Sequence, residues 1–306
     1  MRRRVGIGRR PAITGIRRLP FIALILAGVF WGLGFPLGKL ALRELEPAHM
    51  ILLRFAVASL VSLPFAFATA EARALFRSPV VLLAGVLYGA GFLIQFEGLA
   101  SVTVTLAALL VGAMPALIAV AARLMGEPVS RASWAGVAAA TIGAALIAGK
   151  PGSAGTPIGI ILSLVSLLVF LGWLLVLKRV PVTRSAMAVP AVMLIVATLA
   201  ILPVALLLHG PPPIALSAVA WSGIVGQGLL STFVATAAWQ YGASRVDSAT
   251  AGVFINIEPL MGSMLGIGLF GDPAGLPLIL GGGLIILGSI VVVRGERSVA
   301  AVERPI

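Results

Sequence analysis

Lys39, Arg54 and Glu258 are charged residues within or at the edge of long apolar segments, and they are the first candidates for chemistry in this sequence. A charge in such surroundings is unfavourable by several kcal/mol unless it is paired or neutralised. Lys39 could simply extend to the edge of its segment. Alternatively, Lys39 and Arg54 fall near the same edge as Glu97, so the three could form a polar cluster that holds or gates one side of the protein.

Glu258 has two open interpretations. It lies about half-way along an apolar segment and directly precedes Pro259. It could carry a coupled proton, as carboxylates embedded in membranes often do. It could instead be structural, bonding the backbone carbonyl groups that Pro259 leaves free or contacting Asn256.

Two amide side chains, Gln95 and Gln227, also lie within apolar segments. Such amides commonly form hydrogen bonds between helices, so packing is one interpretation. As groups lining a cavity, they could instead meet the amino or carboxylate group of a substrate. Gln227 lies between two glycines, in the weakest part of its segment.

Several aromatic residues lie inside the apolar segments rather than only near their ends. Apolar packing explains them, but an aromatic-walled cavity would suit apolar amino acids or flat drugs. The candidates of this kind are Tyr88, Phe92, Trp173 and Trp239.

The stretch WGLGFPLGK, residues 31–39, combines three glycines with Pro36 in an otherwise apolar run. Glycines let neighbouring helices approach closely, and Pro36 frees a carbonyl that lipid cannot satisfy. We therefore expect this half of the helix to be buried against other helices. Close packing and a role in gating or lining a cavity both remain open, and Trp31, Phe35 and Pro36 are the candidates for the second role.

Catalytic and nucleotide-driven functions have little support. The chain has no cysteine, and its two histidines, His49 and His209, fall at helix ends. No metal set or catalytic triad can be assembled from these residues. GIGLFG at residues 266–271 fits a dinucleotide-binding pattern but follows no strand, and no Walker motif is present. We expect no enzyme activity, no metal and no cofactor, and a scaffold without transport activity is a remote alternative.

The composition indicates a membrane protein. Hydrophobic residues make up 60% of the chain and charged residues only 10%, with a mean hydropathy of +1.13. Soluble domains carry roughly a quarter charged residues. Runs long enough to cross about 30 Å of hydrocarbon recur along the chain. The sequence therefore predicts an all-α polytopic protein within the lipid bilayer.

Charge, proline and glycine divide the apolar sequence into ten expected spans. The eighth is overlong, so we expect it to be tilted or broken at Gly226-Gln227-Gly228. The expected spans are Leu19–Leu42, His49–Thr69, Pro79–Leu99, Val102–Met125, Ser133–Gly149, Pro157–Lys178, Ser185–His209, Leu216–Ala243, Ser248–Phe270 and Ala274–Val293.

The basic residues predict the orientation. If the N-terminus is cytoplasmic, the 22 lysines and arginines lie in cytoplasmic segments with four exceptions. This bias places both termini in the cytoplasm and accounts for the net charge of +12 without a nucleic-acid partner. The exceptions are Lys39, Arg43, Arg54 and Lys150.

An internal repeat divides the chain. QFEGLASVTVTLAALLVGAMP, residues 95–115, aligns without gaps with WQYGASRVDSATAGVFINIEP, residues 239–259. Five spans per copy require that the two copies enter the membrane from opposite sides, a construction recurrent in secondary transporters. The aligned pairs are Gly98 with Gly242, Pro115 with Pro259, the GEP of 126–128 with the GDP of 271–273, Gly136 with Gly281, and Gly143 with Gly288.

These features resemble the EamA-type transporters of the drug/metabolite transporter superfamily. The similar motifs are WGLGFPLGK, LLRFAVASL at residues 52–60, the GEP that closes the fourth span, and IEP with GDP in the ninth. The resemblance implies a ten-helix carrier with a central cavity that moves small metabolites, often outward, with amino acids among the commonest cargoes. Two features depart from the pattern: Gly172-Trp173 replaces a second Trp-Gly, and the second copy has no arginine matching Arg54, with Lys178 only a loose match to the charges of the first.

The sequence thus predicts two inverted five-helix repeats around a central cavity in the bacterial inner (cytoplasmic) membrane. The expected function is export of amino acids or similar small metabolites, including large apolar and aromatic ones, by alternating access. A proton-coupled exporter of drugs or lipophilic cations is the alternative. The expected segments are a basic N-terminal segment at 1–18, repeats at 19–149 and 157–294, a periplasmic linker at 150–156 and a cytoplasmic tail at 295–306.

The glycine-rich tenth span, LILGGGLIILGSI at residues 278–290, leaves the oligomeric state open. Its small residues could form the interface of a homodimer. They could equally pack against the fifth span within one protomer. Both a monomer and a homodimer are therefore compatible with the sequence.

Overall fold

The computed structural model describes residues 18–302 apart from 127, 150–154, 181–182, 247–250 and 252–253. Residues 1–17 of the expected N-terminal segment, most of the expected linker and the glutamate of GEP, Glu127, therefore lie outside the described residues. So do Lys150, Arg304 and parts of the expected ninth span.

The described part of the chain is helical, and its only extended pairing is an isolated bridge between Val102 and Gly155. The elements are α1 (Leu19–Ala41), α2 (Pro47–Phe67), α3 (Ala70–Ala74), η1 (Leu75–Arg77), α4 (Pro79–Ala100), α5 (Val104–Val111), α6 (Met114–Leu124), α7 (Arg131–Gly149), α8 (Pro157–Leu177), α9 (Ala188–His209), α10 (Ala218–Gly226), η3 (Gln227–Val234), α11 (Ala235–Ala243), α13 (Ile257–Phe270) and α14 (Leu276–Val302).

Local sequence signals set many of these boundaries. Proline occupies the first turn of α1, α2, α4 and α8, where its missing N–H costs no helical hydrogen bond. Side chains cap other starts: Thr103 accepts from the N–H of Leu106, and Ser217 accepts from that of Ala220. α13 ends at Gly271, which has a left-handed φ of 66°.

Within the part of the chain that the structure describes, eight helical segments are long and apolar enough to cross a membrane. The fourth of these combines α5 and α6, which meet at Gly112 and Ala113 just before Pro115. The described part of α13 is a shorter apolar helix, and α7 is a helix where the fifth span is expected. Ten crossings therefore remain a prediction, whereas eight candidate spans are observed.

α14 differs from its expected span. It continues past the expected end at Val293 to Val302. The first part of the segment expected as a tail is therefore helical. Between Val293 and Val302 the chain has no proline and a single glycine, Gly295, so the helix continues beyond the apolar run.

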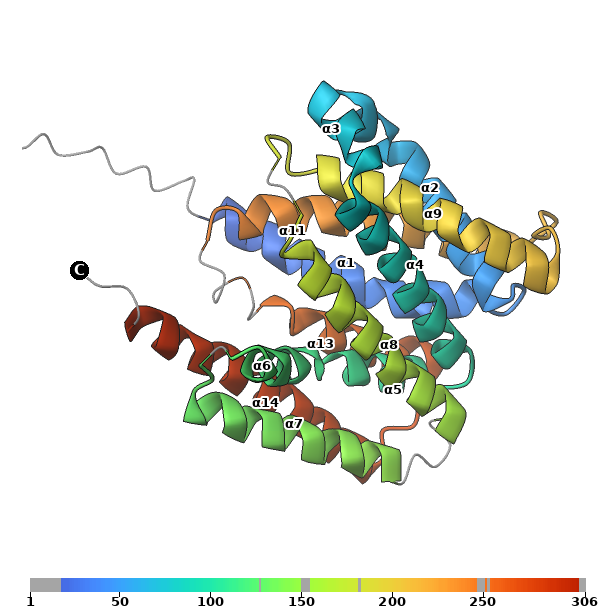
Figure 1. Cartoon of the computed structure of the whole chain (residues 1–306). Helices are drawn as coiled ribbons and strands as arrows, with labels where there is room; N and C mark the ends of the chain where they lie inside the picture. Colours follow the sequence, from blue (N-terminus) through green and yellow to red (C-terminus); the bar gives the residue numbers. More distant parts are fainter. Residues whose placement is uncertain are drawn as a thin grey trace, which may run out of the picture.

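The helices pack in pairs that join the two halves of the chain (Figure 1). α7 lies along α14, α2 along α9, and α4 along α8. α1 lies against α13, α11, α10 and η3. In Figure 1, α1 begins and α14 ends at the same side of the molecule.

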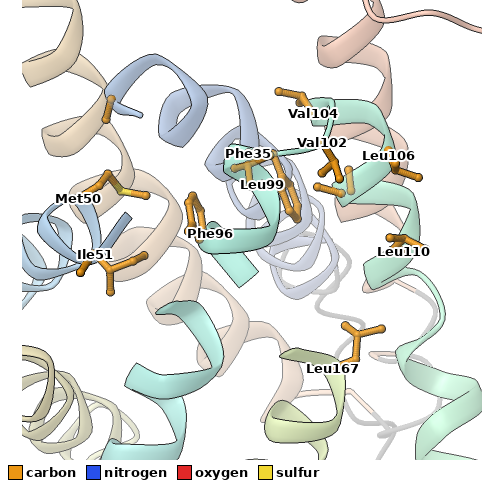
Figure 2. Close-up of a cluster of buried hydrophobic side chains, with 14 of the residues drawn as sticks. Phe35, Met50, Ile51, Phe96, Leu99, Val102, Val104, Leu106, Leu110 and Leu167 are labelled. Atoms are coloured by element: carbon orange, nitrogen blue, oxygen red, sulfur yellow. The ribbon is translucent and has the colours of Figure 1, made fainter. Parts of the chain in front are cut away.

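The largest apolar core lies where the two halves meet. Figure 2 shows Phe96 between Met50 and Ile51 of α2 and Phe35 of α1. This core continues along α4 and α5 with Leu99, Val102, Leu106 and Leu110, and it also includes Leu167 of α8. The core therefore holds α4 and α5 between helices of both halves.

Close approaches at glycines confirm the internal repeat. A Cβ atom on Gly136 or Gly288 would collide with the carbonyl oxygen of the other, and one on Gly143 would collide with that of Gly281. In the alignment of the two halves, Gly136 corresponds to Gly281 and Gly143 corresponds to Gly288. The contact between Gly136 and Gly288 is therefore equivalent to the contact between Gly281 and Gly143. α7 and α14 therefore cross antiparallel, and the glycine-rich surface of α14 is covered within the same chain.

A second pair of glycine contacts shows which residues of α1 and α8 correspond to each other in the two halves. A Cβ on Gly98 would lie 2.9 Å from the carbonyl oxygen of Gly159, and one on Gly242 would lie 2.8 Å from that of Pro20. Gly159 thus corresponds to Pro20. The same shift in sequence places Lys178 at the position of Lys39.

The glycines of α1 are packing contacts on two faces. A Cβ on Gly32 would lie 2.7 Å from Cβ of Met261 and 2.8 Å from the carbonyl oxygen of Glu258, in α13. A Cβ on Gly34 would instead meet Ser231 of η3, and one on Gly38 would meet Phe96 of α4 and Gln227 of η3. α1 is thus held between α13 and η3.

We expect Gly32→Ala to destabilise the protein by about 1–3 kcal/mol, because the new methyl group would clash with backbone atoms of α13, which cannot move without shifting the helix. Gly268→Ala is the matched control, since nothing lies within 4 Å of its Cβ position. Unfolding in mixed micelles measures both. Equal stability of the two variants would contradict the close packing of α1 on α13.

Candidate functional site

The eighth span is irregular where the sequence predicts a weak point. α10 ends at Gly226, and Gln227–Val234 form a π-helix before α11 begins. The hydroxyl of Thr232 donates to the carbonyl oxygen of Gln227, five residues earlier, at 2.9 Å. The helix is therefore wound more loosely here rather than broken, and such segments frequently occur at functional sites.

The repeat explains the π-helix as an insertion. Gly228 packs on the carbonyl of Arg54 and on Val57, and Gly85 packs in the same way on Met193 and Val196. Gly85 thus corresponds to Gly228, while Gly98 corresponds to Gly242. The second half has one residue more between its two glycines than the first, and a π-helix accommodates one extra residue.

Arg54 lies at the centre of the site. Its side chain is 3% exposed, and its Nε donates to Oγ1 of Thr232 at 2.8 Å. Its guanidinium carbon lies 4.2 Å from the ring centroid of Phe92 and 5.5 Å from those of Phe55 and Phe96. These are cation–π distances, so the rings partly compensate for the buried charge. Met193 occupies the equivalent position in the second half.

Rings from three helices extend this site. Tyr88 and Phe92 of α4 have ring centroids 4.8 Å apart. Tyr88 lies 5.1 Å from Trp173, and Phe92 lies 5.0 Å from Phe170, both in α8. The structure therefore brings Arg54, Tyr88, Phe92 and Trp173 together, and it adds Phe170.

Three buried polar atoms near these elements have no hydrogen-bond partner among the described residues: Oε1 of Gln227, Oγ of Ser231 and Nε1 of Trp173. The amide nitrogen of Gln227 donates to the carbonyl oxygen of Gly34, which ties η3 to α1. An unmatched buried polar atom is unfavourable by about 1–3 kcal/mol. Such groups commonly mark a place where water or a ligand binds.

Glu258 lies in the first turn of α13, and Asn256 precedes that helix and is buried. The carboxylate of Glu258 interacts electrostatically with Arg54. A negative charge in the first turn of a helix is also favoured by the helix dipole. Glu258 is therefore the acidic residue that influences Arg54, although the two side chains form no direct ion pair.

Lys39 has different partners from Arg54. Its Nζ donates to the carbonyl oxygen of Leu99 at 2.6 Å, in the last turn of α4, and to that of Val102 at 2.8 Å, just after this helix. Asp272 interacts electrostatically with Lys39 and accepts from the N–H of Thr105 at 2.7 Å. Lys39 thus joins α1 to the α4–α5 connection.

Glu97 is half-buried and interacts electrostatically with Glu46 and His209. His49 contacts His209 ring to ring at 5.6 Å, and its Nε2 lies 2.9 Å from the carbonyl oxygen of Gly210. The expected cluster of Lys39, Arg54 and Glu97 is therefore divided among three sets of partners. Its role as a gate stays a prediction.

The other candidates lie in varied surroundings. Trp31 of α1 contacts Trp239 of α11, with ring centroids 5.2 Å apart. Phe35 and Pro36 are buried in α1, and Gln95 is buried in α4. Their proposed cavity or gating roles stay predictions.

Glu44 fastens the α1–α2 connection to the start of α10. The hydroxyl and the backbone N–H of Ser217 both donate to its carboxylate, and these bonds lower the pKa of Glu44 below its ordinary value of 4.5. The associated stability is present above that ordinary value and lost as the pH falls through the lowered one. We therefore expect wild type to be slightly more stable than Glu44→Gln at pH 7 and equally stable in acid. Thermal unfolding across this range measures it, and a difference that persists in acid would contradict the assignment.

Sequence reasoning missed four residues of these contacts: Thr232, Ser231, Phe170 and Asp272. Hydroxyl residues in apolar helices commonly bond their own backbone, so Ser231 and Thr232 carried no distinctive signal. The extra residue between Gly228 and Gly242 could have indicated the π-helix. Detecting it, however, requires an alignment of Gly85 with Gly228 in addition to that of Gly98 with Gly242. The GDP motif includes Asp272, but the sequence did not show that Asp272 lies near Lys39 and Thr105.

This arrangement defines a class of protein: a two-repeat, all-helical membrane protein with a buried polar and aromatic site between its halves. The chain belongs to the EamA-like transporter family, which matches residues 18–149 and 157–294. It therefore belongs among small-molecule transporters rather than enzymes, and it is consistent with the drug/metabolite transporter superfamily.

Two relatives agree with this membership, and a solved structure shares the fold. A protein of Archaeoglobus fulgidus named "Uncharacterized transporter" is 27% identical over 90% of this chain and 98% of its own. A Pseudomonas aeruginosa protein named "Probable biotin transporter" is 34% identical over 106 residues, which are 34% of this chain and 37% of that protein. A crystal structure with a TM-score of 0.63 and 20% identity covers 91% of this chain and 98% of its own, and it shares the fold.

Proposed function

We propose that this chain is a secondary carrier that exports amino acids, including large apolar and aromatic ones, across the bacterial inner membrane. The observation that carries the proposal is the buried site between the repeats. This site combines Arg54, polar atoms without hydrogen-bond partners and a row of neighbouring aromatic rings. Amino acids combine a charged group with an apolar side chain, and this site offers a partner for each.

The proposed topology has ten crossings in two inverted repeats, with both termini in the cytoplasm. The distribution of lysine and arginine supports the orientation. The antiparallel crossing of α7 and α14 supports inversion, because two equivalent helices run in opposite directions there. The start of α1 and the end of α14 on one side of the molecule support an even number of crossings.

The symmetry of the Lys39 contact supports alternating access. In this topology Lys39 closes the outer side by binding the carbonyls at the end of α4. The repeat relates Lys39 to Lys178, and it relates Leu99 and Val102 to Ala243 and Val246. In the second conformation Lys178 binds those carbonyls and closes the inner side, while the Lys39 contact opens.

Export from cells tests the function and its direction together. Cells that express the protein should survive a toxic analogue, 4-fluorophenylalanine, at concentrations that stop control cells, and should lose preloaded labelled phenylalanine faster. Unchanged survival and unchanged efflux would contradict amino-acid export.

Biotin is a second candidate substrate. The favouring observation is the similarity to the Pseudomonas aeruginosa protein named "Probable biotin transporter". Adding labelled biotin to the same efflux measurement separates the candidates, since efflux of biotin without phenylalanine would favour biotin.

A further inference from the structure

Arg54 has unused capacity for hydrogen bonding. A guanidinium carries five N–H donors in a planar fork. Nε of Arg54 donates to Thr232, and among the described residues none accepts a hydrogen bond from Nη1 or Nη2. A buried arginine normally has its donors matched, and the fork fits a carboxylate with two parallel bonds.

The surroundings of the fork limit what can bind. Phe92 lies on the guanidinium face, and Tyr88, Phe170 and Trp173 continue the aromatic surface away from it. Unmatched atoms of Gln227 and Ser231 lie in the π-helix that supplies Thr232. A ligand here therefore presents an anionic head to Arg54 and an apolar ring to α4 and α8.

The electrostatic balance favours a singly charged head. Tyr88 and Glu258 are the titratable groups that act electrostatically on Arg54, and of these Glu258 is the carboxylic acid. One carboxylate bound to Arg54 leaves Glu258 available for a cationic group on the ligand, whereas a phosphate would add a second negative charge near Glu258. A zwitterion that carries one carboxylate and one ammonium matches both charges.

From these contacts we infer that Arg54 binds the carboxylate of the transported substrate, and that the aromatic residues of α4 and α8 bind its ring. The substrate class is a monocarboxylate with an aromatic or large apolar body. Thr232 is a positioning residue, because it fixes Nε and leaves the two terminal nitrogens directed to the ligand. The inference rests on the proposed function as a carrier and specifies the substrate group that is recognised.

Equilibrium binding to the purified full chain in detergent micelles tests this assignment with three probes. Phenylalanine has both charged groups, 3-phenylpropionate lacks the amine, and phenethylamine lacks the carboxylate. We expect wild type to bind both acids, and to bind phenethylamine at least about tenfold more weakly, because bonds to a charged group are lost.

Arg54→Met should weaken both acids at least about tenfold and leave phenethylamine unchanged. Arg54→Lys keeps the charge without the fork, so it should weaken the acids even if Arg54→Met fails to fold. Thr232→Val should give an intermediate loss for the acids alone. Arg43→Met is the matched control, because Arg43 also lies over a ring, that of Phe270, outside this site.

Acid binding that is unchanged in Arg54→Met and Arg54→Lys would overturn the inference, as would equal affinity for phenethylamine and phenylalanine or no binding of any probe by wild type. Binding of acids through Arg54 without transport of phenylalanine would contradict the proposed function but support the site. Transport of phenylalanine that does not depend on Arg54 would support the proposed function but contradict the assignment of Arg54 as the carboxylate site.

Discussion

Lys39→Met should open the outer side of the protein. The ammonium of Lys39 donates to the carbonyls of Leu99 and Val102, and charge-assisted bonds of this kind contribute about 1.5–3 kcal/mol. Their loss affects only the conformation in which they form, so the population shifts roughly 10- to 100-fold. In right-side-out vesicles, a membrane-impermeant thiol reagent should label Ser231→Cys at least about tenfold faster in this variant.

The chain suits this measurement because it contains no cysteine of its own. Lys178→Met should slow labelling from outside, since it weakens the equivalent contact on the inner side. Arg43→Met removes a neighbouring positive charge without touching these carbonyls and should leave the rate unchanged. Equal rates in Lys39→Met and Lys178→Met would show that the two lysines do not control access.

Glu258→Gln should destabilise the protein by about 1–2 kcal/mol, the Coulomb energy expected for two charges several ångströms apart at an effective dielectric constant near 20. The carboxylate acts on Arg54 at longer range than a direct ion pair, so the variant removes part of the compensation for a buried charge. Unfolding in mixed micelles measures the change. Arg54→Met should restore part of the lost stability, with a coupling energy of about 1–2 kcal/mol between the two sites.

A different result would assign Glu258 another role. If the two substitutions are additive within about 0.5 kcal/mol, Glu258 does not compensate Arg54. If Glu258→Gln is as stable as wild type and loses only transport driven by a pH gradient, then Glu258 carries a coupled proton. That outcome would favour the proton-coupled drug exporter.

The fold was largely predictable because the bilayer restricts the options. Backbone groups in hydrocarbon must be satisfied within helices, so apolar runs bounded by proline and charge predict both helices and their ends. The repeat was predictable for a related reason. Gly136 and Gly143 sit where the two halves nearly touch, and no larger residue fits at those positions.

The site was predictable in its residue types but not in its pairing. Arg54, Tyr88, Phe92, Trp173 and Gln227 were all recognised as unusual in an apolar helix, and the structure brings them into neighbouring positions. Which groups meet depends on helix rotation, and a π-helix changes that rotation beyond Gln227. For the same reason, the sequence could not show that Lys39 binds carbonyls at the end of α4 while Arg54 binds Thr232.

Counterflow in proteoliposomes tests the central claim most directly. The purified chain is reconstituted with unlabelled phenylalanine inside, and entry of labelled phenylalanine is followed without a pH gradient, beside a lipophilic cation as the comparison. We predict saturable, transient accumulation of labelled phenylalanine that 3-phenylpropionate inhibits, and none of the cation. Accumulation of the cation instead, or no exchange until a pH gradient is imposed, would contradict an amino-acid carrier and indicate a coupled drug exporter.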